Sequence, residues 1–103
     1  MKFGIEQNTI DAINNCLESN TRITEAIIYG SRAIGNFKAG SDIDLTLKGK
    51  DLDLTDINKI ENQIDDLLLP YKFDISIMKQ INNNDLLDHI NRIGIIFYSR
   101  AEE

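Results

Sequence analysis

Two aspartates separated by one residue follow a glycine–serine pair, and these residue types together could bind a phosphorylated ligand through a metal ion. Gly30 and Ser31 end a short apolar run, and Asp42 and Asp44 follow after ten intervening residues. A third aspartate, Asp74, lies inside a later apolar run. Carboxylates are the side chains that Mg²⁺ prefers, and neighbouring carboxylates repel one another unless a cation binds between them. If the fold gathers these three side chains, the pattern predicts a cation site.

The alternation of apolar and acidic residues predicts that the aspartates share one face of a sheet. Residues i and i+2 of a strand lie roughly 6.5–7 Å apart on the same side, and an adjacent strand adds a side chain at about 4.8 Å. This spacing suits two Mg²⁺ ions roughly 3.5–4 Å apart, an arrangement that promotes phosphoryl transfer. Because Mg²⁺ takes only some of its ligands from carboxylates, we expect the others from the phosphates of a nucleoside triphosphate.

The glycine–serine pair predicts where those phosphates bind. Gly30 allows close approach of the backbone to a ligand, and the start of a following helix presents free N–H groups. Ser31 adds a hydroxyl donor, and the guanidinium of Arg32 is suited to phosphate oxygens. An Asp-x-Asp or Gly-Ser pair alone is also common in solvated strands and turns. The specific signal is therefore the combination of both motifs with Asp74.

The elements that must position these residues follow from the apolar periodicity. The predicted helices cover 8–18, 31–37, 53–70 and 84–94. The predicted strands cover 25–30, 42–50, 71–78 and 95–99. The helix over 53–70 should bury one apolar stripe, formed by Ile57, Ile60, Ile64, Leu67 and Leu68. This order predicts an α+β fold, with α and β elements mixed along the chain.

Two of the predicted strands carry their acids in the same way. One aliphatic face alternates with an acidic face, both in 42–50 and in 71–78. If these strands are neighbours, Asp42, Asp44 and Asp74 project from the same side of the sheet. We therefore expect helices packed on one face of the sheet and an open acidic face on the other.

Length and composition limit the function further. The 103 residues predict one domain, 1–103. A net charge of −6 argues against direct nucleic-acid binding, which needs a basic surface. The single cysteine, Cys16, cannot form an intrachain disulfide. There is no apolar leader and no run long enough to span a membrane. We expect a cytoplasmic protein without membrane contact.

The stretch GSRAIGNFKAGSDIDL resembles the signature of the DNA polymerase β-like nucleotidyltransferase superfamily. It is most similar to the minimal members, the MNT domains of MntA-type antitoxins that accompany HEPN-domain toxins, and the resemblance covers essentially the whole chain. It implies a polymerase β-like fold with a mixed sheet, two catalytic Mg²⁺ ions and a nucleoside triphosphate donor, ATP. It also implies that Asp42, Asp44 and Asp74 form the catalytic, metal-binding triad.

The resemblance extends to the phosphate site. Gly30 and Ser31 match the phosphate-binding pair of the family, and Arg32 and Ser41 fall at positions that often assist it. Ile34 departs from the common form Gly-Ser-x-Ala-Arg-Gly, because it stands where the second basic residue is usual. The departure concerns phosphate or partner contacts at that position and leaves the triad intact.

Three functions are open at this point. The first is transfer of a nucleoside monophosphate to a hydroxyl of a partner protein, which the resemblance implies is a HEPN toxin, in a homo- or hetero-oligomer. The second is nucleotide transfer to a small molecule, disfavoured because about 100 residues leave no second domain for an acceptor. The third is a binding module that blocks its partner sterically. His89, the only histidine, is interpreted as structural because nothing in the sequence pairs with it.

Overall fold

The computed structural model describes residues 1–100 and contains the helices and strands that the periodicity predicts. In chain order they are α1 (Gln7–Glu18), β1 (Ile23–Tyr29), α2 (Ser31–Ile34), β2 (Ile43–Gly49), α3 (Leu54–Asp65), β3 (Phe73–Ile77), the 3₁₀ turn η1 (Met78–Gln80), α4 (Asn84–Ile93) and β4 (Ile95–Ser99). The α+β class is confirmed.

The strands form one mixed sheet in the order β3-β2-β1-β4. β1 pairs antiparallel with β2 and β4, whereas β2 and β3 run parallel. The register places Asp44 beside Asp74 and, on its other side, beside Tyr29. Because directly paired residues project to the same side of a sheet, these three side chains share one face.

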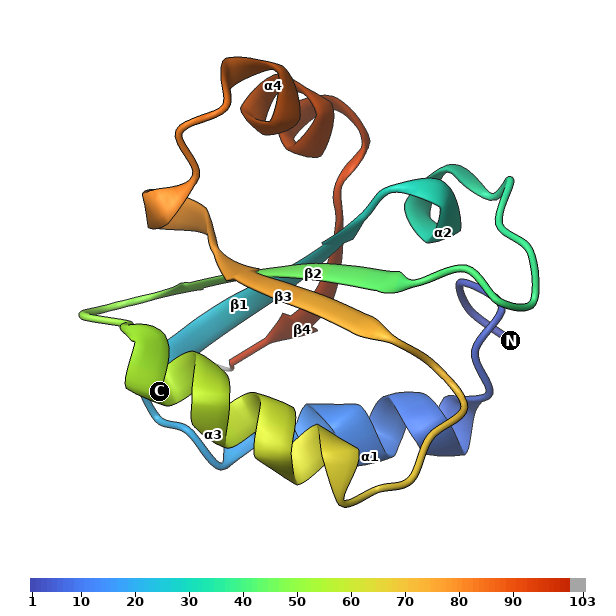
Figure 1. Cartoon of the computed structure of the whole chain (residues 1–103), viewed down its shortest axis with the longest axis horizontal. Coiled ribbons are helices and arrows are strands. Elements are labelled where there is room, and N and C mark those ends of the chain that lie inside the picture. Colours follow the sequence, from blue (N-terminus) through green and yellow to red (C-terminus); the bar gives the residue numbers. More distant parts are fainter. Residues whose placement is uncertain (101–103) are drawn as a thin grey trace.

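α1 and α3 cover the opposite face of the sheet (Figure 1). The aliphatic residues that alternate with the acids point down onto these helices, and Ile43, Leu45 and Leu47 are completely buried. From the helices, Ile13, Leu17 and Ile60 complete the same core and are completely buried too. Burial of each such side chain contributes about 1.5–3 kcal/mol, so this core holds β2 firmly and fixes the direction of the acidic face.

α4 lies on the acidic face, above β1 (Figure 1). A Cβ added at Gly94, just after α4, would collide with Cγ2 of Ile27. His89 of α4 packs edge-on against Tyr29, with ring centroids 6.1 Å apart. β1 is apolar on both faces and needs cover on both. The expected one-sided packing therefore holds for α1 and α3 only. The acidic face is covered over β1 and at Thr46 of β2, which is completely buried, and it is open at the end of β2 and β3 that carries Asp44 and Asp74.

Two predicted helices end earlier than expected. α2 is a single turn because Gly35 adopts φ 99° directly after Ile34. α3 ends at Asp65, and the chain then turns so that β3 can return to the sheet. Leu68 lies in that turn with φ 54° and is 89% exposed, so its predicted place on the apolar stripe is wrong.

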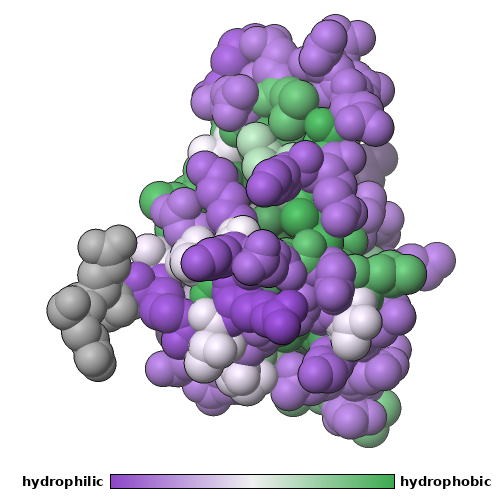
Figure 2. Space-filling view, turned by 90° about the vertical axis from the view of Figure 1, so that its left-hand side faces the viewer, coloured by the Kyte–Doolittle hydropathy of each residue, from purple (hydrophilic) through white to green (hydrophobic). Residues whose placement is uncertain are grey.

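The surface is mainly hydrophilic on the side shown in Figure 2, where apolar side chains show through beneath α4. This agrees with the net charge of −6. No helix within residues 1–100 has the length and apolar character needed to cross a membrane.

Candidate active site

Asp44 and Asp74 stand side by side on neighbouring parallel strands. Asp44 is half-buried at the middle of the sheet, whereas Asp74 is exposed on the edge strand. Burial raises the pKa of the Asp44 carboxyl, and the negative charges of Asp74 and Asp42 raise it further. A proton or a cation bound at Asp44 would therefore relieve the repulsion between the two carboxylates.

Asp42 directly precedes β2 and is exposed. Its negative charge contributes to the raised pKa of Asp44, so Asp42 lies near this carboxyl, and a metal site shared by all three aspartates stays a prediction. None of the three carboxylates forms an ion pair within residues 1–100. In the same part of the chain, no three acidic, histidine or cysteine side chains converge closely enough to enclose a metal ion by themselves. A divalent cation here would need ligands from a bound substrate as well.

Gly30 ends β1 directly beside this pair. Its backbone has φ 77° and ψ −157°, a region that is essentially restricted to glycine. A Cβ at this position would collide with Oδ2 of Asp44. The glycine of the motif is therefore required both by the backbone angles and by the close approach of the aspartate.

Ser31 begins α2 next to Gly30 and is half-buried. α2 contains four residues, so the helix dipole expected behind a phosphate amounts to one turn only. Ile34, which replaces the usual basic residue, is 54% exposed and supplies no charge. A phosphate at this turn would depend on the N–H groups and hydroxyl of the first residues.

Arg32 does not point toward the carboxylates. Its side chain is buried, and its guanidinium donates to the carbonyl oxygens of Phe3 (2.8 Å), Ser41 (3.0 Å) and Ala39 (3.4 Å). It also stacks between the rings of Phe37 and Tyr71, about 5 Å from each centroid. These donors hold the loop between α2 and β2, so the phosphate contact expected of Arg32 would require them to leave their carbonyl partners, and the contact stays a prediction.

Ser41 belongs to the same loop. Its hydroxyl accepts a hydrogen bond from the backbone N–H of Lys38 (2.8 Å), and its carbonyl accepts from Arg32. These bonds stabilise the turn that leads into Asp42. Ser41 therefore positions the aspartate motif through the backbone.

His89, which is interpreted from the sequence as structural, is half-buried and lies at the site, where it has a partner that the sequence does not indicate. Its Nε2 accepts a hydrogen bond from the backbone N–H of Gly30 (3.2 Å), 59 residues away in the chain. The sequence signal that could have found it is weak: one histidine on a helix that follows the third aspartate. Tyr29 lies below the ring, and burial raises its phenol pKa, with a further contribution from Asp74 and Asp44.

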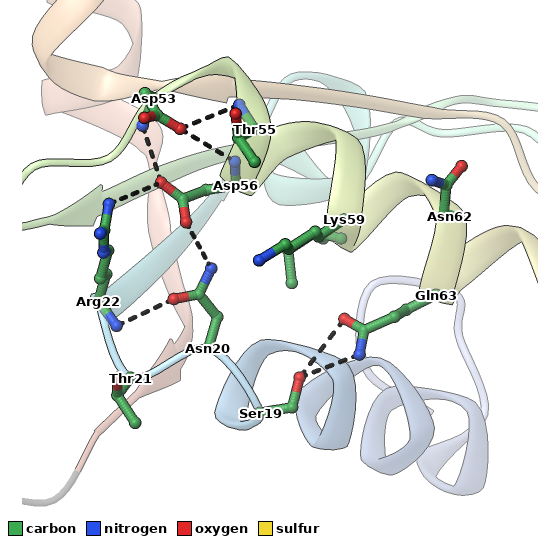
Figure 3. A pocket seen from close by; sticks show the side chains of 11 residues that line it. Ser19, Asn20, Thr21, Arg22, Asp53, Thr55, Asp56, Lys59, Asn62 and Gln63 are labelled. Carbon is green, nitrogen blue, oxygen red and sulfur yellow. Dashed lines mark hydrogen bonds and ion pairs between the residues drawn. The ribbon is translucent and has the colours of Figure 1, made fainter.

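A second hollow, of about 540 Å³, lies at the other end of β1, between α1 and α3 (Figure 3). Several of its polar groups are engaged with one another: Asn20 and Arg22 contact the buried Asp56, which also caps α3 together with Asp53. Hydrogen bonds from Asn20 and the Asp53 amide lower the pKa of Asp56. These contacts join α1 and β1 to α3, so the polar residues that make them have a structural role in this hollow.

The geometry of two paired aspartates beside a glycine–serine turn agrees with the sequence comparison. Residues 11–103 match the model of the family described as Polymerase beta, Nucleotidyltransferase. The chain belongs to this nucleotidyltransferase family. A search among curated proteins finds no match.

Solved structures share the fold of this nucleotidyltransferase domain. A toxin–antitoxin complex with AMP-PNP matches at TM-score 0.70 and 16% identity, over 93% of this chain and 75% of the other. The Shewanella oneidensis complex of a tri-AMPylated HEPN toxin with an MNT antitoxin gives 0.68 and 15%, over 93% and 74%. A nucleotidyltransferase described as putative, from Sulfolobus solfataricus, gives 0.55 and 19%, over 97% and 90%.

Proposed function

We propose that this protein is a Mg²⁺-dependent nucleotidyltransferase that transfers AMP from ATP to a hydroxyl of a partner protein, and that the partner is a HEPN-domain toxin. The observation that carries the proposal is the register of Asp44 with Asp74 beside the glycine-only turn at Gly30. A protein that blocked its partner by contact alone would have no use for neighbouring acids that raise the pKa of Asp44.

The carboxylates fit a divalent cation because they are adjacent, unpaired within residues 1–100 and accessible from the open part of the face. Asp42, Asp44 and Asp74 would hold two Mg²⁺ ions together with oxygens of the triphosphate. Bound there, Mg²⁺ supplies charge neutralisation on the phosphates and makes the attacking hydroxyl more acidic.

The protein's own groups would orient the two reactants. The N–H groups and hydroxyl at Gly30 and Ser31 would bind phosphate oxygens. The acceptor oxygen would form a bond to the α-phosphorus as the bond to pyrophosphate breaks, and pyrophosphate would leave. Asp74, exposed on the edge strand, is accessible to an acceptor that approaches from solvent and could take up its proton.

The partner and the donor are supported by the structural neighbours, which include complexes of a toxin with its antitoxin and an AMPylated HEPN toxin. A net charge of −6 would steer a basic partner toward this protein. The donor fits the expected cytoplasmic location, where ATP and Mg²⁺ are abundant. A protein partner could also cover the open part of the acidic face, which has no walls for a small acceptor.

Mass spectrometry of the partner tests the proposal. The protein is co-expressed with the product of the neighbouring gene, and the partner should gain mass in AMP-sized steps on tyrosine, serine or threonine. Asp44→Asn should abolish the gain, whereas Asp66→Asn, an exposed acid at the end of α3, should not. An unmodified partner that still forms a stable complex with the wild-type protein would refute catalysis and leave steric blocking.

A further inference from the structure

The backbone N–H of Gly30 is satisfied by a side chain instead of by the backbone. It donates to Nε2 of His89 at 3.2 Å. Because Nε2 is the acceptor, the neutral ring carries its proton on Nδ1. His89 extends from α4, which covers the acidic face, so the N–H that it binds points to the face that carries Asp44.

This N–H is a suitable donor for a phosphate oxygen. It belongs to a residue whose Cβ position is filled by the Asp44 carboxylate, so it lies close to the acids that would hold the cation. Because this N–H is only partly accessible to water, leaving it without an acceptor is unfavourable. An anionic phosphate oxygen forms a stronger hydrogen bond with it than a neutral imidazole nitrogen does. The two acceptors would compete for one donor.

We propose that His89 is a displaceable internal acceptor, which satisfies the Gly30 N–H in the free protein and gives way to a phosphate oxygen of the nucleoside triphosphate. The inference rests on the proposed function, since it concerns the nucleotide site. Displacement breaks one hydrogen bond of the ring, because no other hydrogen bond of His89 is found within residues 1–100. Its remaining contact is edge-on packing against Tyr29 at 6.1 Å.

The energetic consequence is a lower affinity for the nucleotide than the turn could provide alone. ATP must replace an existing bond, and a typical net hydrogen bond changes a binding constant by about two- to tenfold. A side chain that packs on Tyr29 without accepting a hydrogen bond should remove this competition. A purely structural histidine would behave in the opposite way, since its loss would disorder the turn and weaken ATP binding.

The direction of the change in affinity is therefore the test. Calorimetric titration with ATP and Mg²⁺ should give a Kd about two- to tenfold lower for His89→Phe than for the wild type. His89→Gln, which retains an acceptor at similar reach, should stay within about twofold of the wild type. Arg92→Gln, which breaks only the exposed pair with Asp88 on α4, controls for loosening of the helix and should not change the Kd.

NMR of the wild-type protein supplies a second readout. The ¹⁵N signal of His89 Nε2 and the Gly30 amide signal should move together on titration with ATP or tripolyphosphate, and neither should move with adenosine, which lacks phosphates. An equal or weaker affinity of His89→Phe for ATP, or signals that stay unchanged at saturating ATP, would overturn the inference. Wild-type protein that binds no ATP would refute the proposed function as well, whereas AMP transfer with an unimproved His89→Phe would refute the inference alone.

Discussion

Replacing Gly30 by alanine tests whether the end of β1 is built around Asp44. The backbone angles of Gly30, φ 77° and ψ −157°, cost an L-residue about 1–3 kcal/mol. The added Cβ would also collide with Oδ2 of Asp44, but that atom ends a side chain that can rotate away. The collision should therefore displace the carboxylate and add little to the loss of stability. For a domain of this size the strain lowers Tm by about 5–20 °C.

Two other glycines serve as matched controls in thermal melts followed by circular dichroism. Gly35 has φ 99°, yet an added Cβ meets nothing within 4 Å, so Gly35→Ala should lose about 1 kcal/mol from strain alone. Gly40 has neither a positive φ nor a neighbour within 4 Å, so Gly40→Ala should keep its stability or gain up to about 1 kcal/mol. AMP transfer should be lost only in Gly30→Ala, because only there is Asp44 displaced.

The double variant Gly30→Ala with Asp44→Ala separates the two effects. It removes the collision and keeps the strain, so the loss of stability caused by Gly30→Ala should be nearly the same in both backgrounds. A Gly30→Ala protein with the same Tm as Gly40→Ala would refute the argument from strain. One that melts early but transfers AMP at the wild-type rate would refute the argument that Asp44 is displaced.

Three further changes have expected outcomes. Without Mg²⁺, Asp44→Asn should raise Tm at neutral pH. Burial and the neighbouring aspartates raise the Asp44 pKa in the folded protein, so the stability of the wild type falls as pH rises above the ordinary carboxyl pKa. The neutral amide that Asp44→Asn introduces avoids this loss. Identical pH profiles of the two Tm values would contradict this. Asp56→Asn should lose about 1–3 kcal/mol of stability at neutral pH, because the hydrogen bond from Asn20 stabilises the charged carboxylate and lowers the Asp56 pKa. The wild type loses this stabilisation as pH falls through the lowered pKa, so the Tm values of the two proteins should converge in acid. Arg32→Lys should lose about 2–3 kcal/mol, since a compact ammonium cannot reach the three separate carbonyls that the planar guanidinium spans. An unchanged Tm with weaker ATP binding would identify a phosphate ligand instead.

The acidic face could be predicted from sequence because it depends on a local period. In a strand, alternation alone decides which residues share a side, so Asp44 and Asp74 could be assigned to faces without a structure. Their exact pairing could not, since one aliphatic face fits several offsets between parallel strands. That pairing follows from how β2 and β3 pack on α1 and α3.

The position of α4 could not be predicted for a different reason. Its periodicity shows that one side is apolar, but not which surface that side covers. The surface proves to be the second apolar face of β1, and only this choice brings His89 to Gly30, 59 residues away. Long-range contacts of single polar atoms leave no pattern in the sequence.

Arg32 gives a physical reason for the spacing between the glycine–serine turn and the aspartate motif. Arg32 follows Ser31 directly in the chain, and its guanidinium binds the carbonyl of Ser41, the residue just before Asp42. One buried side chain thus ties the turn that would bind phosphates to the start of the strand that would bind the metal ions. The same guanidinium also donates to the carbonyl of Phe3, which connects this part of the site to the N-terminal segment. Arg32 therefore acts on the site by setting the distance between its halves, so loss of Arg32 should impair AMP transfer even where each half still binds its own ligand.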